Sequence, residues 1–183
     1  MTTLVAVRDH GRVHIGSDSQ ATLDNSKTAV AGGKITTTGR YTYGVAGLAE
    51  MMFRLQRSEW PAFSGDPDKF VVDTLIPWLL GTQDELFADF GISEDSDNPF
   101  QQVPRSTVLL ALAGEIYELQ LVKGLSPLKR ADGKYAVGSG SVYARGALNA
   151  SSKTDKKLVL GALEAAAKND LYTSGPFVVK TVR

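Results

Sequence analysis

The hydrophobic pattern at the start of the chain predicts a strand that is buried on both of its faces. In residues 3–7 (TLVAV), both alternating sets of side chains are apolar or β-branched, as in strands covered on two sides. A turn at residues 9–11 (DHG) separates this strand from a second one at 13–15, which ends at 16–19 (GSDS). Because most chain ends fray in solvent, a buried first strand that places residue 2 inside the fold needs a reason.

Apolar side chains recur every three to four positions in later segments, which predicts two pairs of helices. Asp66 or Asp68 suits the N-cap of the second helix, and Pro77 inside that helix predicts a kink. We expect the four helices at residues 49–59, 67–90, 142–150 and 154–170.

Segments rich in β-formers fill much of the remaining chain. Residues 19–33 are small and polar without a clear period, so we expect a surface loop there, and a second, acidic loop at 91–104. A two-residue turn at 114–115 (GE) is expected to join two strands of a hairpin. The later strands are expected at residues 34–38, 41–46, 107–113, 116–121, 135–137 and 177–182.

The order of these elements predicts the class of fold. Runs of strands separated by helix pairs favour stacked layers of an α+β fold over a parallel βαβ sheet. The chain has 183 residues, which is enough for one domain with a sizeable core, and it contains neither an internal repeat nor a linker. Residues 1–183 are therefore expected to form a single domain.

Charge and composition exclude several functions. Twenty Lys and Arg residues balance twenty Asp and Glu residues, so the charge supports neither a nucleic-acid nor a membrane partner. The lack of cysteine excludes disulfides, thiol nucleophiles and Cys-based metal sites. No apolar run is long enough to cross a bilayer, and the first strand lacks the features of a signal peptide, so we expect a cytoplasmic protein.

Thr2 is the first candidate for chemistry. Methionine aminopeptidases remove Met1 when the next residue is small, and Thr2 would then carry a hydroxyl and a free α-amine. A terminal amine has a pKa near ~8, so a useful fraction is neutral at neutral pH and can accept the proton of the hydroxyl. Threonine nucleophiles that use their own N-terminal amine as base have this arrangement. Met-Thr-Thr is also an ordinary chain start, so Thr2 needs support from the rest of the sequence.

Four further polar residues stand beside strand or helix ends: Asp18, Lys34, Ser139 and Asp170. Each alone is better explained as a turn, cap or surface group. With their surroundings, however, they resemble the proteasome β-subunit and HslV family of N-terminal nucleophile threonine peptidases, and within it the small bacterial proteasome homologues rather than HslV itself. The resemblance covers nearly the whole chain and rests on residues 2–7 (TTLVAV), 16–22 (GSDSQAT), 34–35 (KI), 45–47 (VAG), 138–144 (GSGSVYA) and 170–175 (DLYTSG).

The resemblance implies a four-layer αββα sandwich of the Ntn-hydrolase type and a role for each matched catalytic residue. Thr2 supplies both nucleophile and base, Lys34 lies beside its hydroxyl, and Asp18 holds Lys34 in place. The lysine charge favours a neutral amine and the developing alkoxide. Ser139 and Asp170 fix the α-amine through hydrogen bonds.

The resemblance also implies binding positions. The main-chain N–H of Gly47, at a helix start, would donate to the oxyanion of the transition state. No cofactor is required, although the main-chain carbonyls of Ala167, Asp170 and Thr173 match a loop that holds a structural monovalent cation such as Na⁺ in relatives. The pocket for the residue before the cut is lined by small or uncharged residues, which favours hydrophobic side chains because a buried charge would find no partner. These residues are Ala21, Gly32, Thr36, Val45, Ala49 and Phe53.

The function that follows is a self-compartmentalising threonine endopeptidase. The resemblance implies a homo-oligomer, a double ring of six- or seven-fold symmetry, that cleaves peptides or unfolded proteins and can work with an ATPase unfoldase. Two alternatives stay open: an Ntn amidase that cleaves small amides in an open pocket, and a catalytically silent subunit that only scaffolds a ring. Silent members usually lack the nucleophile or the lysine, and both Thr2 and Lys34 are present here.

Overall fold

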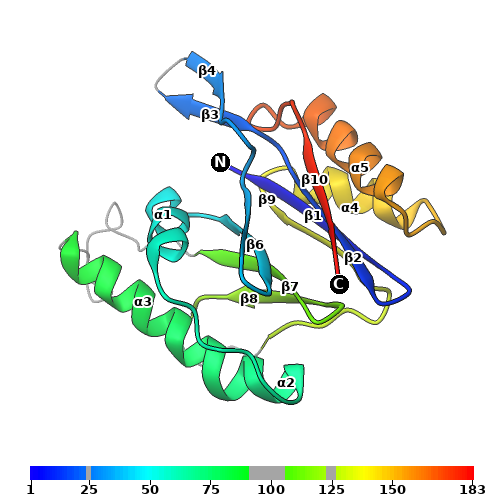
Figure 1. Ribbon diagram of the computed structural model, residues 1–183. Coiled ribbons are helices and arrows are strands. Elements are labelled where there is room, and N and C mark those ends of the chain that lie inside the picture. Colours follow the sequence, from blue (N-terminus) through cyan, green and yellow to red (C-terminus); the bar gives the residue numbers. More distant parts are fainter. Residues whose placement is uncertain (24–25, 91–105, 123–126) are drawn as a thin grey trace.

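Two four-stranded antiparallel sheets lie face to face in the computed structural model, which describes residues 1–23, 26–90, 106–122 and 127–183 (Figure 1). The predicted acidic loop at 91–104 lies outside these residues. The first sheet has the order β10-β2-β1-β9, and the second has the order β5-β6-β7-β8. The strands of the first sheet are β1 (Thr3–Asp9), β2 (Arg12–Ser17), β9 (Lys134–Gly138) and β10 (Val178–Val182). Those of the second are β5 (Ile35–Thr38), β6 (Tyr41–Ala46), β7 (Thr107–Leu112) and β8 (Glu115–Gln120).

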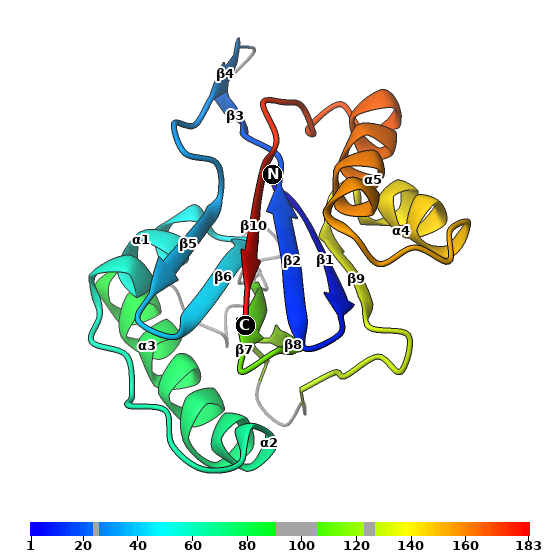
Figure 2. The same cartoon turned by 45° about the vertical axis from the view of Figure 1, so that its right-hand side comes forward.

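Helices cover the outer face of each sheet, so the molecule has four layers (Figure 2). The first sheet is covered by α4 (Ser141–Asn149) and α5 (Lys156–Asn169). The second is covered by α1 (Ala49–Arg57), α2 (Pro67–Phe70), a π-helical turn (Val71–Leu75) and α3 (Ile76–Asp89). This arrangement confirms the predicted αββα sandwich. Among the helices described here, none has the length and apolar character needed to cross a membrane.

Strand β1 is the central buried element, as its sequence predicts. Leu4 and Ala6 belong to the apolar cluster between the two sheets, whereas Val5 and Val7 pack into the cluster beneath α4 and α5. All four side chains are fully buried. The start of β1, and with it residue 2, is therefore held by packing on both faces rather than left free in solvent.

Two local predictions were wrong. Residues expected to form a loop at 19–33 contain a hairpin of β3 (Gln20–Leu23) and β4 (Ser26–Ala29), which projects beyond the sandwich near the N-terminus (Figure 1). All of β4 is exposed, so no apolar alternation marked it in the sequence. The turn between β7 and β8 is Ala113-Gly114, one residue earlier than expected, and both residues have positive φ (51° and 77°).

The helical segment around Pro77 also differs from the prediction. A π-helical turn precedes the proline, and Pro77 lies in the first turn of α3. The chain stays helical through this point, with Ile76 N donating to Val71 O, and the next residue is Pro77, which has no N–H to pair. The predicted start of the preceding helix is confirmed, because the Asp66 side chain caps α2 by accepting from Lys69 N.

Candidate active site

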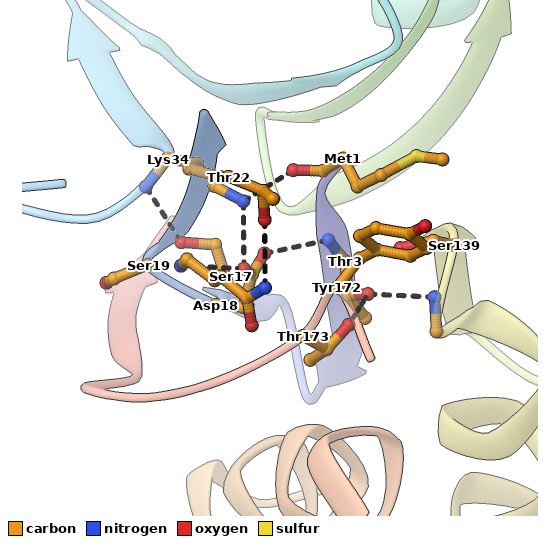
Figure 3. A network of polar contacts seen from close by, with 12 residues as sticks. Met1, Thr3, Ser17, Asp18, Ser19, Thr22, Lys34, Ser139, Tyr172 and Thr173 are labelled. Carbon is orange, nitrogen blue, oxygen red and sulfur yellow. Dashed lines mark hydrogen bonds and ion pairs between the residues drawn. The ribbon is translucent and has the colours of Figure 1, made fainter. Parts of the chain in front are cut away.

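The main chain of Thr3 fixes a buried carboxylate beside residue 2. The amide of Thr3 donates to Asp18 Oδ1 over 2.8 Å, and the carbonyl of Thr3 accepts from Asp18 N over 3.2 Å. Asp18 is fully buried just after the end of β2. The pairing of β1 with β2 thus continues one residue past the strand and places this carboxylate at the start of β1 (Figure 3).

Lys34 supplies the counter-charge for Asp18. Its ammonium nitrogen lies 2.8 Å from Asp18 Oδ2, which also accepts from the amide of Gln20 over 2.9 Å. The main-chain N–H of Lys34 donates to the buried hydroxyl of Ser17 over 3.0 Å, so this residue is held at both ends. A buried carboxylate requires such partners to offset the loss of hydration.

The same ammonium group reaches the peptide group that precedes Thr2. Lys34 Nζ donates to the carbonyl oxygen of Met1 over 2.7 Å (Figure 3). On the other side of Thr2, its carbonyl oxygen accepts from the amide of Ser139 over 3.0 Å. Half-buried Thr2 therefore lies between Lys34 and Ser139, two residues predicted to flank it.

Gly138 allows this close approach. A Cβ at this position would lie 1.8 Å from the carbonyl oxygen of Thr2, and its φ of +95° is one that other residues rarely adopt. The end of β9 can therefore come near enough for Ser139 to bond to Thr2 only because residue 138 has no side chain.

A second carboxylate, Asp170, accepts hydrogen bonds just after the end of α5. Its Oδ2 accepts from the Ser139 hydroxyl over 2.8 Å and from the Thr173 hydroxyl over 2.5 Å, and its Oδ1 accepts from the amide of Tyr172 over 3.3 Å. Burial acts to raise the pKa of Asp170, but the bonds from Thr173, Ser139 and Tyr172 outweigh it and lower the pKa below 3.8. The residue is therefore ionised at neutral pH.

The predicted oxyanion donor lies at the start of α1. Gly47 is exposed, has φ +133°, and directly precedes Leu48, the N-cap residue of the helix. The positive φ explains the glycine, because a residue with a Cβ would be strained in this conformation.

The six predicted pocket residues come from four elements and the turn before β5. Val45 is only 6% exposed and packs in the core cluster beneath α1, whereas Ala49 and Phe53 are exposed on α1 itself. Ala21 in β3 and Thr36 in β5 are half-buried. Gly32 is exposed in the turn before β5, with φ +78°.

The predicted cation ligands lie at the end of α5 and in the turn that follows. The carbonyl of Asp170 accepts from Thr173 N over 3.3 Å, and the nearby carbonyl of Leu171 accepts from Lys27 Nζ over 2.9 Å and from Gln20 Nε2 over 3.0 Å. Main-chain oxygens are suitable ligands for a hard cation, but the Lys27 ammonium opposes one beside this turn. Within the described ranges, no group of three His, Asp or Glu side chains could hold a metal ion.

The sequence predicted one of the polar pairs in this site and missed two hydroxyls. Asp18 and Lys34 are in contact, as predicted. Ser139 and Asp170 were each predicted to bond to the α-amine, and the structure shows that they also bond to each other. The side chains of Thr3 and Ser17 were not predicted to take part in these networks. In the sequence, Thr3 cannot be distinguished from any β-branched strand residue, and Ser17 reads as part of a turn.

Comparison with known proteins identifies relatives that span nearly the whole chain. No protein-family model matches it. The chain is 27% identical to the ATP-dependent protease subunit HslV of Cytophaga hutchinsonii over 191 aligned positions, which cover 98% of this chain and 95% of the relative. It is also 27% identical to HslV of Chlorobium luteolum over 190 positions, covering 99% of this chain and 94% of the relative.

Solved structures share the fold. Thiobacillus denitrificans BPH in complex with epoxomicin superposes with a TM-score of 0.71 at 21% identity, covering 100% of this chain and 98% of that one. HslV from Trypanosoma brucei superposes with a TM-score of 0.65 at 20% identity, covering 100% and 99%. The near-full-length sequence relatives support the HslV and proteasome β-subunit family for this chain, and the solved structures share its four-layer fold.

Proposed function

We propose that the chain is a proteasome-type threonine peptidase, in which Thr2 becomes the nucleophile once the Met1–Thr2 bond is cleaved. One observation carries this proposal. Lys34, held by the buried carboxylate of Asp18, donates over 2.7 Å to the peptide group that precedes Thr2. A fixed cation at this point favours a neutral α-amine and an anionic oxygen on Thr2.

The reaction proceeds in two steps. In the first, the Thr2 α-amine accepts the hydroxyl proton while the oxygen attacks the carbonyl carbon of a peptide bond, giving a tetrahedral oxyanion. The N–H of Gly47 donates to that oxyanion, and the C–N bond then breaks as the α-amine returns the proton to the leaving nitrogen. In the second step, water attacks the resulting ester under the same base and releases the acid product.

Ser139 and Asp170 orient the base. The Ser139 hydroxyl hydrogen is bound to Asp170, so its oxygen is left to accept a hydrogen of the Thr2 amine. This contact leaves the lone pair of the amine free to take the hydroxyl proton. No step depends on a metal, and a structural cation at the turn after α5 would have to tolerate the charge of Lys27.

Substrates and assembly follow from the family. The relatives are named ATP-dependent protease subunits, which supports a closed homo-oligomeric double ring of six- or seven-fold symmetry, peptides or unfolded proteins as substrates, and an ATPase as partner. The pocket residues carry no charge, which supports cleavage after hydrophobic side chains. The hydrogen-bonded pair of Asp18 and Lys34 argues against a silent scaffold subunit.

Intact mass and peptide hydrolysis test the proposal. Purified protein should lack Met1, hydrolyse fluorogenic peptides and take up one equivalent of a peptidyl electrophile at Thr2. Epoxomicin, the ligand of the Thiobacillus neighbour, should also bind. Thr2→Ala should abolish both hydrolysis and labelling, because a methyl group cannot form the ester, while Thr2→Ser should retain some of each. Hydrolysis by Thr2→Ala near the wild-type rate would refute the assignment.

A further inference from the structure

The hydroxyl of Thr3 stands in a buried chain of hydrogen bonds that ends at Asp170. It accepts from the amide of Gly140 over 2.9 Å and lies 2.6 Å from the hydroxyl oxygen of Thr173. Thr173 in turn donates to Asp170 Oδ2 over 2.5 Å. Thr3 is fully buried, and Thr173 is 2% exposed. The contacts are therefore shielded from water, which strengthens them.

The direction of every bond in this chain is determined by the groups at its two ends. An amide N–H can only donate, and an ionised carboxylate can only accept. The hydrogen of Thr173 is thus committed to Asp170, so Thr173 must accept from the Thr3 hydroxyl. Thr3 can supply that hydrogen because its own oxygen accepts from Gly140. The Gly140 amide and the Thr3 and Thr173 hydroxyls therefore form one chain of three donors that ends at the Asp170 carboxylate.

The surroundings leave the two hydroxyls little freedom to adopt another arrangement. A Cβ on Gly140 would lie 2.7 Å from Thr3 Oγ1, 2.8 Å from Thr173 Oγ1 and 2.9 Å from the Cβ of Ala166. The absence of a side chain at residue 140 lets its amide enter the cluster. The two hydroxyls are therefore closely packed against the main chain of Gly140, beside Ala166.

Thr3 also touches the first carboxylate, through its main chain. Its N–H and C=O both bond to Asp18, which holds Lys34. One residue therefore connects to both carboxylates that flank Thr2, to Asp18 through the backbone and to Asp170 through the side chain.

We propose that Thr3 is a positioning residue, whose hydroxyl holds Thr173 in place and so keeps Asp170 turned toward Ser139. With Asp170 in that orientation, the Ser139 hydrogen stays bound to the carboxylate, and the Ser139 oxygen faces the amine of Thr2. This inference rests on the proposed function, which it deepens by assigning part of the orientation of the base to the residue next to the nucleophile. Thr3 itself touches no substrate because it is buried.

Two substitutions and a matched control separate this role from a general loss of stability. Thr3→Val keeps the shape and removes the hydroxyl, whereas Thr3→Ser keeps the hydroxyl. The control is Thr42→Val in β6, which removes another buried hydroxyl, bonded to Thr37 over 3.0 Å. For Thr3→Val we expect kcat for peptide hydrolysis to fall about tenfold with KM unchanged, as for loss of one hydrogen bond in the transition state. The kcat of Thr3→Ser should stay within about threefold of the wild-type value, and the kcat of Thr42→Val should stay within the same range.

The pKa of Asp170, followed by NMR of the side-chain carboxyl carbon, gives a readout that does not depend on activity. It should rise in Thr3→Val and stay unchanged in Thr3→Ser and Thr42→Val. An unchanged pKa with unchanged kcat in folded Thr3→Val would overturn the inference. If the wild type hydrolyses no peptide, the proposed function fails, and the Asp170 titration still decides the role of Thr3. Should Thr3→Val not fold, Thr3→Cys takes its place with the same expected direction, because a thiol is a weak donor.

Discussion

The ammonium nitrogen of Lys34 lies 2.7 Å from the carbonyl oxygen of Met1. This contact joins the charged side chain to the one peptide group that must be cut before Thr2 can carry a free amine. In the proposed processed form, which lacks Met1, this acceptor would be gone while the bond to Asp18 would remain. Lys34 would then have hydrogen-bonding capacity free beside residue 2, where the proposed mechanism develops an anionic oxygen.

Two replacements of Lys34 should distinguish the contribution of its positive charge from that of its shape. Lys34→Ala should abolish peptide hydrolysis and, because Asp18 would be left as a buried unpaired charge, destabilise the fold by roughly 3–5 kcal/mol. Lys34→Arg should preserve most of the stability but little of the activity, because a planar guanidinium cannot replace a compact ammonium in the same space. Urea unfolding and hydrolysis measured on both variants check this. Activity of Lys34→Ala above a tenth of wild type would contradict the proposed role.

The hydrogen bonds to Asp170 should make stability depend on pH in the acid range. The pKa of Asp170 is lowered below 3.8 in the folded protein. Its contribution is therefore fully present above the unfolded-state pKa and is lost as the pH falls through the folded-state pKa. Unfolding free energies measured by urea between neutral and acid pH should fall less steeply in Asp170→Asn than in wild type. Asp132→Asn, which removes an exposed carboxylate elsewhere, should follow the wild-type curve.

A larger side chain at position 45 should change which peptides are cleaved. Val45→Phe is expected to reduce hydrolysis after Phe or Tyr more than after Ala, because it fills the proposed pocket. Since Val45 is 6% exposed and belongs to the core beneath α1, overpacking should also cost about 1–3 kcal/mol. Ala49→Phe, at an exposed position of α1, tests the pocket with less strain on the core. Fluorogenic peptides that differ only before the cut provide the measurement, and best turnover after Arg or Glu would contradict the pocket.

Assembly into a ring should be visible in solution. Native mass spectrometry is expected to show a closed homo-oligomer, the usual outcome for identical subunits. A groove between α1 and α3 exposes apolar surface, including Phe90 at 60%. Phe90→Asp should weaken assembly if this face packs against a neighbouring copy, whereas Leu128→Asp, remote from the groove, serves as control. A stable wild-type monomer would refute the ring.

The sequence predicted the four layers and the pair of Asp18 with Lys34 because each left a clear signal. Alternating apolar residues marked the buried strands, and the surroundings of Asp18, Lys34, Ser139 and Asp170 matched a family pattern. The hairpin of β3 and β4 left no such signal, because all of β4 is exposed and polar or small residues dominate it. The role of Thr3 was hidden for a different reason. Its hydroxyl partners, Gly140 and Thr173, lie 137 and 170 positions away, and no local pattern records a contact of that kind.

The lack of space around Gly138 restricts which amino acids can occupy this position. A single methyl group there would collide with the carbonyl oxygen of Thr2 at 1.8 Å, and the backbone conformation is already unfavourable for other residues. In a saturation library screened for peptide hydrolysis, only glycine should survive at this position, while the exposed residues of β4 should accept most replacements. Position 138 would thus appear as intolerant as the proposed nucleophile, although it contributes no chemical group to the proposed reaction.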